Sequence, residues 1–512
     1  MTSVDSRCAR LLQDARARWL LGDAAGTWAA LAQAEELAGA DRRLQILVLA
    51  ERSVACVRAE RATEALAAAS QCLALAAESA GQPGAAGQPS PAERDRPLGE
   101  AGPTARDDAV RAAVADARVS HALARGGAIS AGRRNEEAIA EAVADLDAVA
   151  TSGDPALVGA RIRAITGALV LRLAGIEAAL GSGHGEAQAW IWVSRARVLS
   201  EQLRDPGTVV RQAVDLGFHT GQWARAWDHA LSDIDRDKHR NEQVALLTKA
   251  AQLAWERGWE DHARHYGQQA LTASVGVDLP WVRVYAYLGG VIAAAAGAGS
   301  VEAALRAYTR CTTRAGHATR PNRAWLAAQV ALEDGLPAAK VRTFLDRTLP
   351  GGLEHPALHA AAEVQLRHRE GRPVDPDLFE AADITRQRAP ERARILLVRA
   401  AERGRTGLHT AAAQDLAQAR TIVRHWPGRV LQRVEAAVEQ VTPSVPGTPA
   451  QRRVLDLLVE GWSNRDIAGR LGCSQRTVAV HVSALLAASG TTSRTELAGR
   501  ELRRRLLGSG YE

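Results

Sequence analysis

Residues 448–507 read TPAQRRVLDLLVEGWSNRDIAGRLGCSQRTVAVHVSALLAASGTTSRTELAGRELRRRLL. Four positions in this stretch carry side chains that cap helix N-termini, and each is followed by residues suited to a first helical turn. These positions are Thr448 with Pro449 and Gln451, Ser463 with Asp466, Ser474 with Thr477, and Ser493 with Glu496. The stretch therefore predicts four short helices.

Apolar residues recur on one side of each predicted helix and suffice for one small core. They are Val454, Leu455 and Leu458 in the first helix, Ile467 and Leu471 in the second, Val478, Val482 and Leu485 in the third, and Leu497 and Leu502 in the fourth. Only Leu471, Gly472 and Cys473 separate the second helix from the third, with glycine where a left-handed turn is needed. This connection is typical of a helix-turn-helix, and we expect the third helix to enter the major groove of DNA.

The same stretch is the basic part of the chain, whose formal net charge is only +6 over 512 residues. Its arginines are Arg452, Arg453, Arg465, Arg470, Arg476, Arg494, Arg500, Arg503, Arg504 and Arg505, against the acids Asp456, Glu460, Asp466, Glu496 and Glu501. A small basic domain of this kind is attracted to phosphate backbones.

Residues 460–497 resemble the C-terminal DNA-binding domain of the LuxR family of bacterial regulators. The residues that carry the resemblance are Gly461, Ser463 to Ala468, Leu471, Ser474, Thr477, Val478, His481, Val482, Gly490 and Ser493 to Glu496. The resemblance implies a four-helix domain whose third helix reads base edges and whose fourth helix helps to form a dimer on a two-fold DNA site.

Carried over by position, the resemblance implies two sets of site residues. The DNA-binding set is Ser474, Gln475, Arg476, Thr477, Ala479, Val480, Ser483, Asn464, Arg465 and Arg494. The dimerisation set is Glu496, Leu497, Arg500 and Leu502. We expect Arg476 to reach a guanine or a phosphate and Val480 to touch a thymine methyl group. Ala479 departs from the family, which usually has a lysine or another polar residue there, so fewer phosphate contacts are expected.

The rest of the chain is predicted to be all-α. Aromatic residues make up only 4% of the chain, and apolar residues recur at helical spacing with few alternating runs. We expect helical hairpins over residues 1–78, a disordered Gly/Pro-rich linker or loop over 79–108, a helical repeat region over 109–441, a linker over 442–447 and the helix-turn-helix domain over 448–512.

A weak repeat indicates an α-solenoid. Three segments place an alanine five residues after a glycine: Gly221 and Ala226, Gly258 and Ala263, and Gly299 and Ala304. Successive glycines stand 37 and 41 residues apart, close to the roughly 34 residues of a tetratricopeptide unit. These segments resemble tetratricopeptide repeats, and a generic α-solenoid is the competing interpretation. Either arrangement predicts stacked helix pairs around a concave binding surface.

The sequence predicts neither an enzyme nor a cofactor or metal site. It contains no GxxxxGK[ST] loop and no recognisable nucleophile–base or carboxylate pair, and its paired histidines lack the glutamate of a zinc motif. Five widely spaced cysteines without a CxxC pair suit a reducing cytoplasm. No signal peptide and no membrane-spanning run of about 18 apolar residues is expected, so a cytoplasmic protein without membrane contact is predicted.

These patterns predict a non-enzymatic transcription regulator. Its partners would be double-stranded DNA, a second copy of the chain at least on DNA, and a protein or small-molecule effector at the helical repeats. The alternative interpretation is an interaction scaffold whose C-terminal domain serves protein contacts only.

Overall fold

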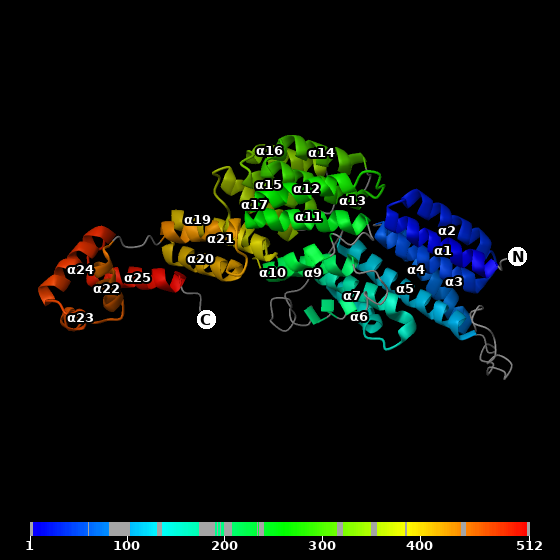
Figure 1. Cartoon of the computed structure of the whole chain (residues 1–512), viewed down its shortest axis with the longest axis horizontal. Helices are drawn as coiled ribbons and strands as arrows, with labels where there is room; N and C mark the ends of the chain where they lie inside the picture. Colours follow the sequence, from blue (N-terminus) through cyan, green and yellow to red (C-terminus); the bar gives the residue numbers. More distant parts are fainter. Residues whose placement is uncertain are drawn as a thin grey trace.

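The computed structural model describes residues 4–59, 61–80, 103–130, 136–173, 190–191, 193–194, 196–198, 207–232, 234, 240–314, 321–349, 356–384, 387–441 and 447–508. These ranges contain helices and no β-strand, which confirms the all-α prediction. Figure 1 shows an elongated molecule with α1–α4 at one end and α22–α25 at the other. The predicted repeat region lies between them.

Helices make up most of the described part of the chain before residue 442. Those of the first part are α1 (Val4–Leu21), α2 (Ala24–Ala38), α3 (Arg42–Arg58), α4 (Ala62–Ala80), α5 (Pro103–Ser130), α6 (Glu136–Ala150), the 3-10 turn η2 (Pro155–Leu157) and α7 (Val158–Leu173). Those of the second part are α9 (Gly207–Thr220), α10 (Trp223–Ser232), α11 (Arg240–Arg257), α12 (Glu260–Ala273), α13 (Pro280–Ala293), the π-helical turn η4 (Ala294–Ala298), α14 (Val301–Arg314), α15 (Pro321–Glu333), α16 (Ala338–Thr348), α17 (Pro356–Arg369), α18 (Pro376–Ala381), α19 (Ala389–Arg405), α20 (His409–Val423) and α21 (Arg429–Val441).

The predicted glycine positions form turns between paired helices. Gly221 joins α9 to α10, and Gly258 joins α11 to α12, with φ of 77° and 80°. The alanines five residues later, Ala226 and Ala263, are fully buried against the preceding helices. The glycine frees the turn and the small alanine lets the two helices approach, so the repeated spacing encodes a helical hairpin. The hairpins are present, but they do not distinguish tetratricopeptide units from another α-solenoid.

The last helices fold back onto the middle ones. α19 contacts α9, and α21 contacts α11. Phe218 of α9 and Trp426, between α20 and α21, are fully buried with ring centroids 5.0 Å apart. At Gly428, whose φ is 140°, a Cβ atom would lie 2.2 Å from the carbonyl oxygen of Glu256. Only glycine permits this approach, so the helices from α9 to α21 close on themselves.

A buried ionic cluster accompanies this closure. The Arg394 guanidinium of α19 donates to both oxygens of Glu256 in α11, at 2.8 and 2.7 Å, and to Glu333 in α15 at 2.7 Å. These three side chains are 4%, 2% and 3% exposed. Burial raises the pKa of Glu256, whereas Arg394 and Arg433 together outweigh burial and hold the pKa of Glu333 below its usual value. One arginine thus ties three helices together.

The N-terminal helices dock on the same body through the turn between α1 and α2. Asn241 of α11 donates to the carbonyl of Trp19 at 2.6 Å, and the amide of Asp278 donates to the carbonyl of Gly22 at 3.3 Å. Trp19 is 5% exposed and joins a core cluster with residues of α11 and α13, including Val244. The contact links residues more than 200 positions apart, which places the first hairpin against the repeat region.

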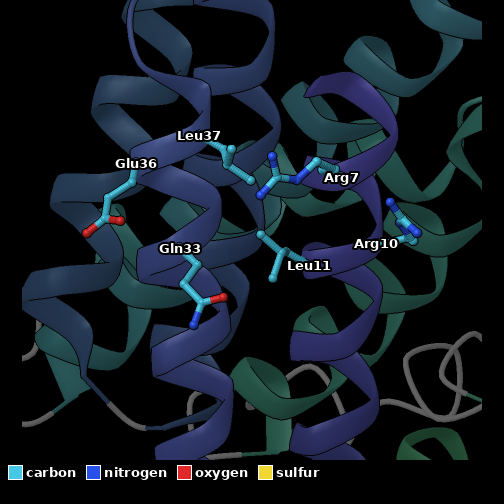
Figure 2. Close-up of a pocket in the computed structure, with 6 residues that line it drawn as sticks. All are labelled: Arg7, Arg10, Leu11, Gln33, Glu36 and Leu37. Atoms are coloured by element: carbon cyan, nitrogen blue, oxygen red, sulfur yellow. The ribbon is translucent and has the colours of Figure 1, made fainter. Parts of the chain in front are cut away.

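A surface groove lies between α1 and α2. It is lined by Arg7, Arg10, Leu11, Gln33, Glu36 and Leu37. Figure 2 shows Arg7 reaching toward Leu37 on the neighbouring helix. The lining therefore combines apolar contact with a few separated charges.

The two linker expectations lie mostly outside the described residues, and the first overlaps two helices at its ends. The linker predicted over 79–108 overlaps the end of α4 at Ala80 and the start of α5 at Pro103, and residues 81–102 lie outside the described ranges. Proline at the first position of a helix is favourable, so the proline-rich composition did not exclude a helix start there. Most of the linker predicted over 442–447 also lies outside the described residues.

One described helix is long and apolar enough to span a membrane by length and composition alone, whereas no such run was expected from the sequence. The 19 residues of Pro280–Ala298, which form α13 and η4, are long and apolar enough, although 56% of their most apolar stretch is buried inside the protein. Val291 and Ile292 of this helix are fully buried in the same core as Trp325. Alanines and glycines extend the apolar run because close helix packing requires small residues.

Replacing the central arginine of the ionic cluster, Arg394→Met, is expected to lower the free energy of unfolding by about 3–5 kcal/mol, because the substitution leaves buried carboxylates without their partner. Arg405→Met is the matched control, since Arg405 pairs with Glu402 at the surface and is 55% exposed. Urea denaturation followed by circular dichroism measures both variants. Equal midpoints for the two variants would show that the cluster does not hold the helices together.

Candidate nucleic-acid interface

The C-terminal helices begin at the four predicted caps. They are α22 (Pro449–Val459), α23 (Asn464–Leu471), α24 (Gln475–Ser489) and α25 (Arg494–Gly508). Thr448 and Gln451 form a reciprocal capping box at 3.3 and 2.7 Å, and Ser474 accepts from the amide of Thr477 at 3.0 Å. Gly472 ends α23 in the left-handed conformation, with φ of 64° and ψ of 33°. The predicted helix-turn-helix is therefore formed by α23 and α24.

The core of these four helices matches most of the predicted apolar set. Its buried members are Val454, Leu455, Leu457, Leu458, Ile467, Ala468, Val478, Val482, Leu485 and Leu497. Leu502, which we expected in this core, is 46% exposed instead. One turn of α25 thus presents an apolar side chain to solvent, because Leu502, five residues after the buried Leu497, lies on another side of the helix.

One face of α24 points away from the core. Gln475, Arg476, Ala479, Val480 and Ser483 are all exposed, and Val480 is 62% exposed. An exposed arginine beside an exposed valine can contact both the polar edge and the methyl group of a base pair. This face therefore has the chemistry needed for reading DNA.

Two members of the predicted DNA-binding set lie at the start of the same helix. The hydroxyl groups of Ser474 and Thr477 are 2.8 Å apart and both are exposed. Their capping bonds hold the N-terminal turn of α24 in place. The free amides of such a turn favour an anion such as phosphate.

The remaining members of the set are Asn464, Arg465 and Arg494, of which Asn464 and Arg494 join two helices. Arg494 of α25 donates to the side chain of Asn464 at 2.6 Å and to the carbonyl of Trp462. Arg465 is exposed. Asn464 and Arg494 therefore fix the start of α23 against α25, and their predicted DNA contacts would have to be made in addition to this bond.

The sequence analysis missed a feature beside these residues. Trp462 is 37% exposed and its ring lies 5.0 Å from the guanidinium of Arg470. The indole donates to Glu460 at 2.9 Å. No signal in the sequence marks this contact, because single apolar residues are common on protein surfaces and only the fold places Arg470 beside the ring.

The predicted dimerisation set divides into three groups. Leu497 is fully buried in the core of its own domain, so it does not offer its side chain to a second chain. Glu496 accepts from the amide and hydroxyl groups of Thr492 at 2.8 and 3.0 Å, which lowers its pKa, and Arg500 donates to the carbonyl of Ser489. Leu502 is exposed. Glu496 and Arg500 stabilise the ends of helices, and Leu502 alone offers an apolar contact.

Comparison with known proteins identifies this domain. Residues 448–500 match the family described as bacterial regulatory proteins, luxR family. The C-terminal domain is a LuxR-type helix-turn-helix domain. Domains of this type bind DNA in transcription regulation, and the exposed polar face of α24 is consistent with that role.

One curated relative supports the same assignment. The chain is 32% identical over 137 residues to Response regulator Rre1 of Synechocystis sp.. The alignment covers 25% of this chain and 49% of the relative. The chain therefore spans about half the length of that protein, and the similarity does not extend to the whole of either chain.

Replacing Arg476 and Val480 together by alanine is expected to weaken binding to a specific site by about 1–3 kcal/mol for each base that the protein no longer touches. Both side chains are exposed, so the domain should keep its helical content. Fluorescence anisotropy on the preferred site and on a scrambled duplex measures the effect. Arg372→Ala, at an arginine 55% exposed in the helical region, is the matched control. An unchanged preference between the two duplexes would place the reading face elsewhere.

Proposed function

We propose that the protein is a sequence-specific DNA-binding transcription regulator whose helical region binds an effector or a partner protein. The outward face of α24 carries this proposal, because Arg476 and Val480 stand exposed beside a capped helix start. A domain used only for protein contacts would not need this pairing of a guanidinium with a methyl-bearing side chain at helical spacing. The domain family supports the same function.

A DNA-recovery experiment tests the proposal. Sheared genomic DNA is incubated with the full-length protein and with a version that ends at Val441, and the retained fragments are sequenced. We expect only the full-length protein to enrich a common site, with affinity that falls as salt is raised, because bound phosphates release counterions. Enrichment by both versions, or by neither, would favour the scaffold interpretation.

We also propose that the protein binds its site as a homodimer. Leu502 supports this proposal, since an apolar side chain 46% exposed on α25 is available to the same residue of a second chain. A two-fold contact through one helix requires a site with two-fold symmetry. A recovered site without such symmetry would argue for binding as a monomer.

The domain organisation proposed here follows the hairpins. Residues 1–78 and 109–441 would form the sensory part, with 79–108 and 442–447 as connections and 448–512 as the DNA-binding part. Paired helices with glycine turns at Gly221 and Gly258 support a helical repeat within the second range, either of tetratricopeptide-like units or of a generic α-solenoid. The closed path from α9 to α21 is a departure from an open array of such units.

Coupling between the two parts would run through α25, which contacts α20 of the helical region. We propose that this contact restrains the DNA-binding domain, and that effector binding releases it. The contact uses the helix that carries Leu502, so docking on α20 and pairing with a second chain compete for one element. An effector can shift this balance only by binding one arrangement more tightly.

Lengthening the connection between the parts is expected to raise DNA affinity. An insertion of twelve Gly/Ser residues between Val441 and Gly447 increases the closure entropy of the α20–α25 contact, which should tighten DNA binding about fivefold at most. Anisotropy on the recovered site measures the change. The control places the same insertion after Gly371, an exposed turn residue remote from α25 in sequence. The same affinity for both insertions would show that the α20–α25 contact does not restrain the domain.

A further inference from the structure

Three cationic side chains from different helices converge near Tyr285 of α13. The guanidinium of Arg323, in α15, lies 4.0 Å from the Tyr285 ring centroid, and the Lys249 ammonium of α11 lies 5.7 Å from it. Arg211 of α9 lies 5.8 Å from the ring of Trp281, which packs edge-on at 6.0 Å from Tyr285. The cluster therefore joins the first helices of four successive hairpins.

Part of this cluster is buried and part reaches solvent. Tyr285 and Lys249 are 6% and 5% exposed. The side chains of Arg211 and Asp215 are 18% and 27% exposed. A small ligand could therefore approach from the α9 side and meet charges that lie mostly out of water, where electrostatic attraction is stronger.

Acidic side chains pair with two of the three cations. Asp215 pairs with Lys249, and Glu242 pairs with Arg211 at 2.9 Å. Burial raises the pKa of Tyr285, yet Arg323, Lys249 and Arg211 outweigh burial and Asp215 together and lower this pKa to about 7.

Two other titratable side chains near the cluster, His219 and Tyr308, carry no negative charge at physiological pH. His219 of α9 has its pKa lowered to about 4, first by burial and then by Arg388, so it is neutral at physiological pH. Tyr308 of α14 has its pKa raised by burial and stays protonated. Neither side chain therefore neutralises the cations around Tyr285.

A buried donor points to the same kind of ligand. The indole Nε1 of Trp281 is out of contact with solvent and finds no acceptor among the described residues. A buried N–H group without a partner is uncommon in folded proteins. Because Arg211 lies 5.8 Å from this ring, an oxyanion would suit the missing acceptor, since charge-assisted hydrogen bonds to carboxylate or phosphate are strong.

We propose that Arg211, Lys249, Trp281, Tyr285 and Arg323 form a binding site for the oxyanion of a small ligand, either a carboxylate or a phosphate. An oxyanion would then be the class of ligand that the helical region binds. A role for this ligand in regulating DNA binding rests on the proposed function. Binding itself does not depend on the DNA-binding domain, so it can be measured separately.

The full-length protein and its Tyr285→Phe variant test the site. The difference between their phenolate absorbances, titrated against pH, isolates Tyr285. In sodium chloride we expect a midpoint near 7. Sodium sulfate, as a mimic of phosphate, or sodium succinate, at matched ionic strength, should raise the midpoint by roughly one pH unit, because a bound anion favours the protonated phenol. A midpoint near the ordinary 10, or one that neither anion moves, would overturn the proposal.

Two further variants locate the effect. Arg323→Gln should abolish the response to the anion, whereas Arg306→Gln, at an arginine 57% exposed on α14, should keep it. Circular dichroism checks that both variants are folded. A response that survives in Arg323→Gln would overturn the assignment to this cluster.

The two anions separate the possible sources. A shift with succinate alone identifies a carboxylate ligand, a shift with sulfate alone identifies a phosphate, and a shift with both supports a general oxyanion site. DNA binding is measured in parallel on the same preparations. A protein that binds no DNA but shows the anion shift would refute the proposed function and leave the site standing, and the reverse result would do the opposite.

Discussion

The Arg394 guanidinium bonds to carboxylates on two other helices, Glu256 of α11 and Glu333 of α15, and the three side chains are at most 4% exposed. Buried charges are tolerated only when their partners are in place, so these helices must come together at once. In an open solenoid each repeat touches only its neighbours and stability adds up along the chain. Here residues 138 positions apart share one ion pair, and the helices from α9 to α21 are expected to behave as one cooperative body.

Closure changes what the inner helices can bind. An open array would offer a long concave surface to a peptide, whereas inner positions of the closed body are occupied by ion pairs such as Arg394 with Glu256 and Arg399 with Asp415. Around Tyr285, cationic side chains lie close to the ring, and a buried indole N–H lacks an acceptor among the described residues. Small anions suit such a surface better than extended chains do.

The sequence predicted the C-terminal domain well because its signals are local. Caps, the Gly472 turn and apolar spacing act within a few residues, and all four helices begin where these signals placed them. The exposure of Leu502 follows from helical spacing that the expected core overlooked, because five residues at about 100° each place Leu502 roughly 140° around the helix from the buried Leu497. The bond between Asn464 and Arg494 could not be predicted, because it depends on how α25 lies against α23.

The closure of the helical region could not be predicted from the sequence, because it depends on contacts between residues far apart in the chain. The glycine and alanine spacing predicted hairpins, and hairpins are present, but nothing in a repeat of 37 to 41 residues indicates that Gly428 meets the end of α11.

The closure of the helical region has a consequence for regulation. Because α19 touches α9, the helix that carries Arg211 is two packing steps from α20, against which α25 rests. An anion bound near Arg211 would change DNA affinity tenfold only if its own affinity differed tenfold, or about 1.4 kcal/mol, between the docked and released arrangements. An open array can absorb a small shift of one helix by unwinding slightly. In the closed body a shift of α9 must instead be taken up at the contacts of α9 with α19 and α11, so the closed body can supply this difference in affinity.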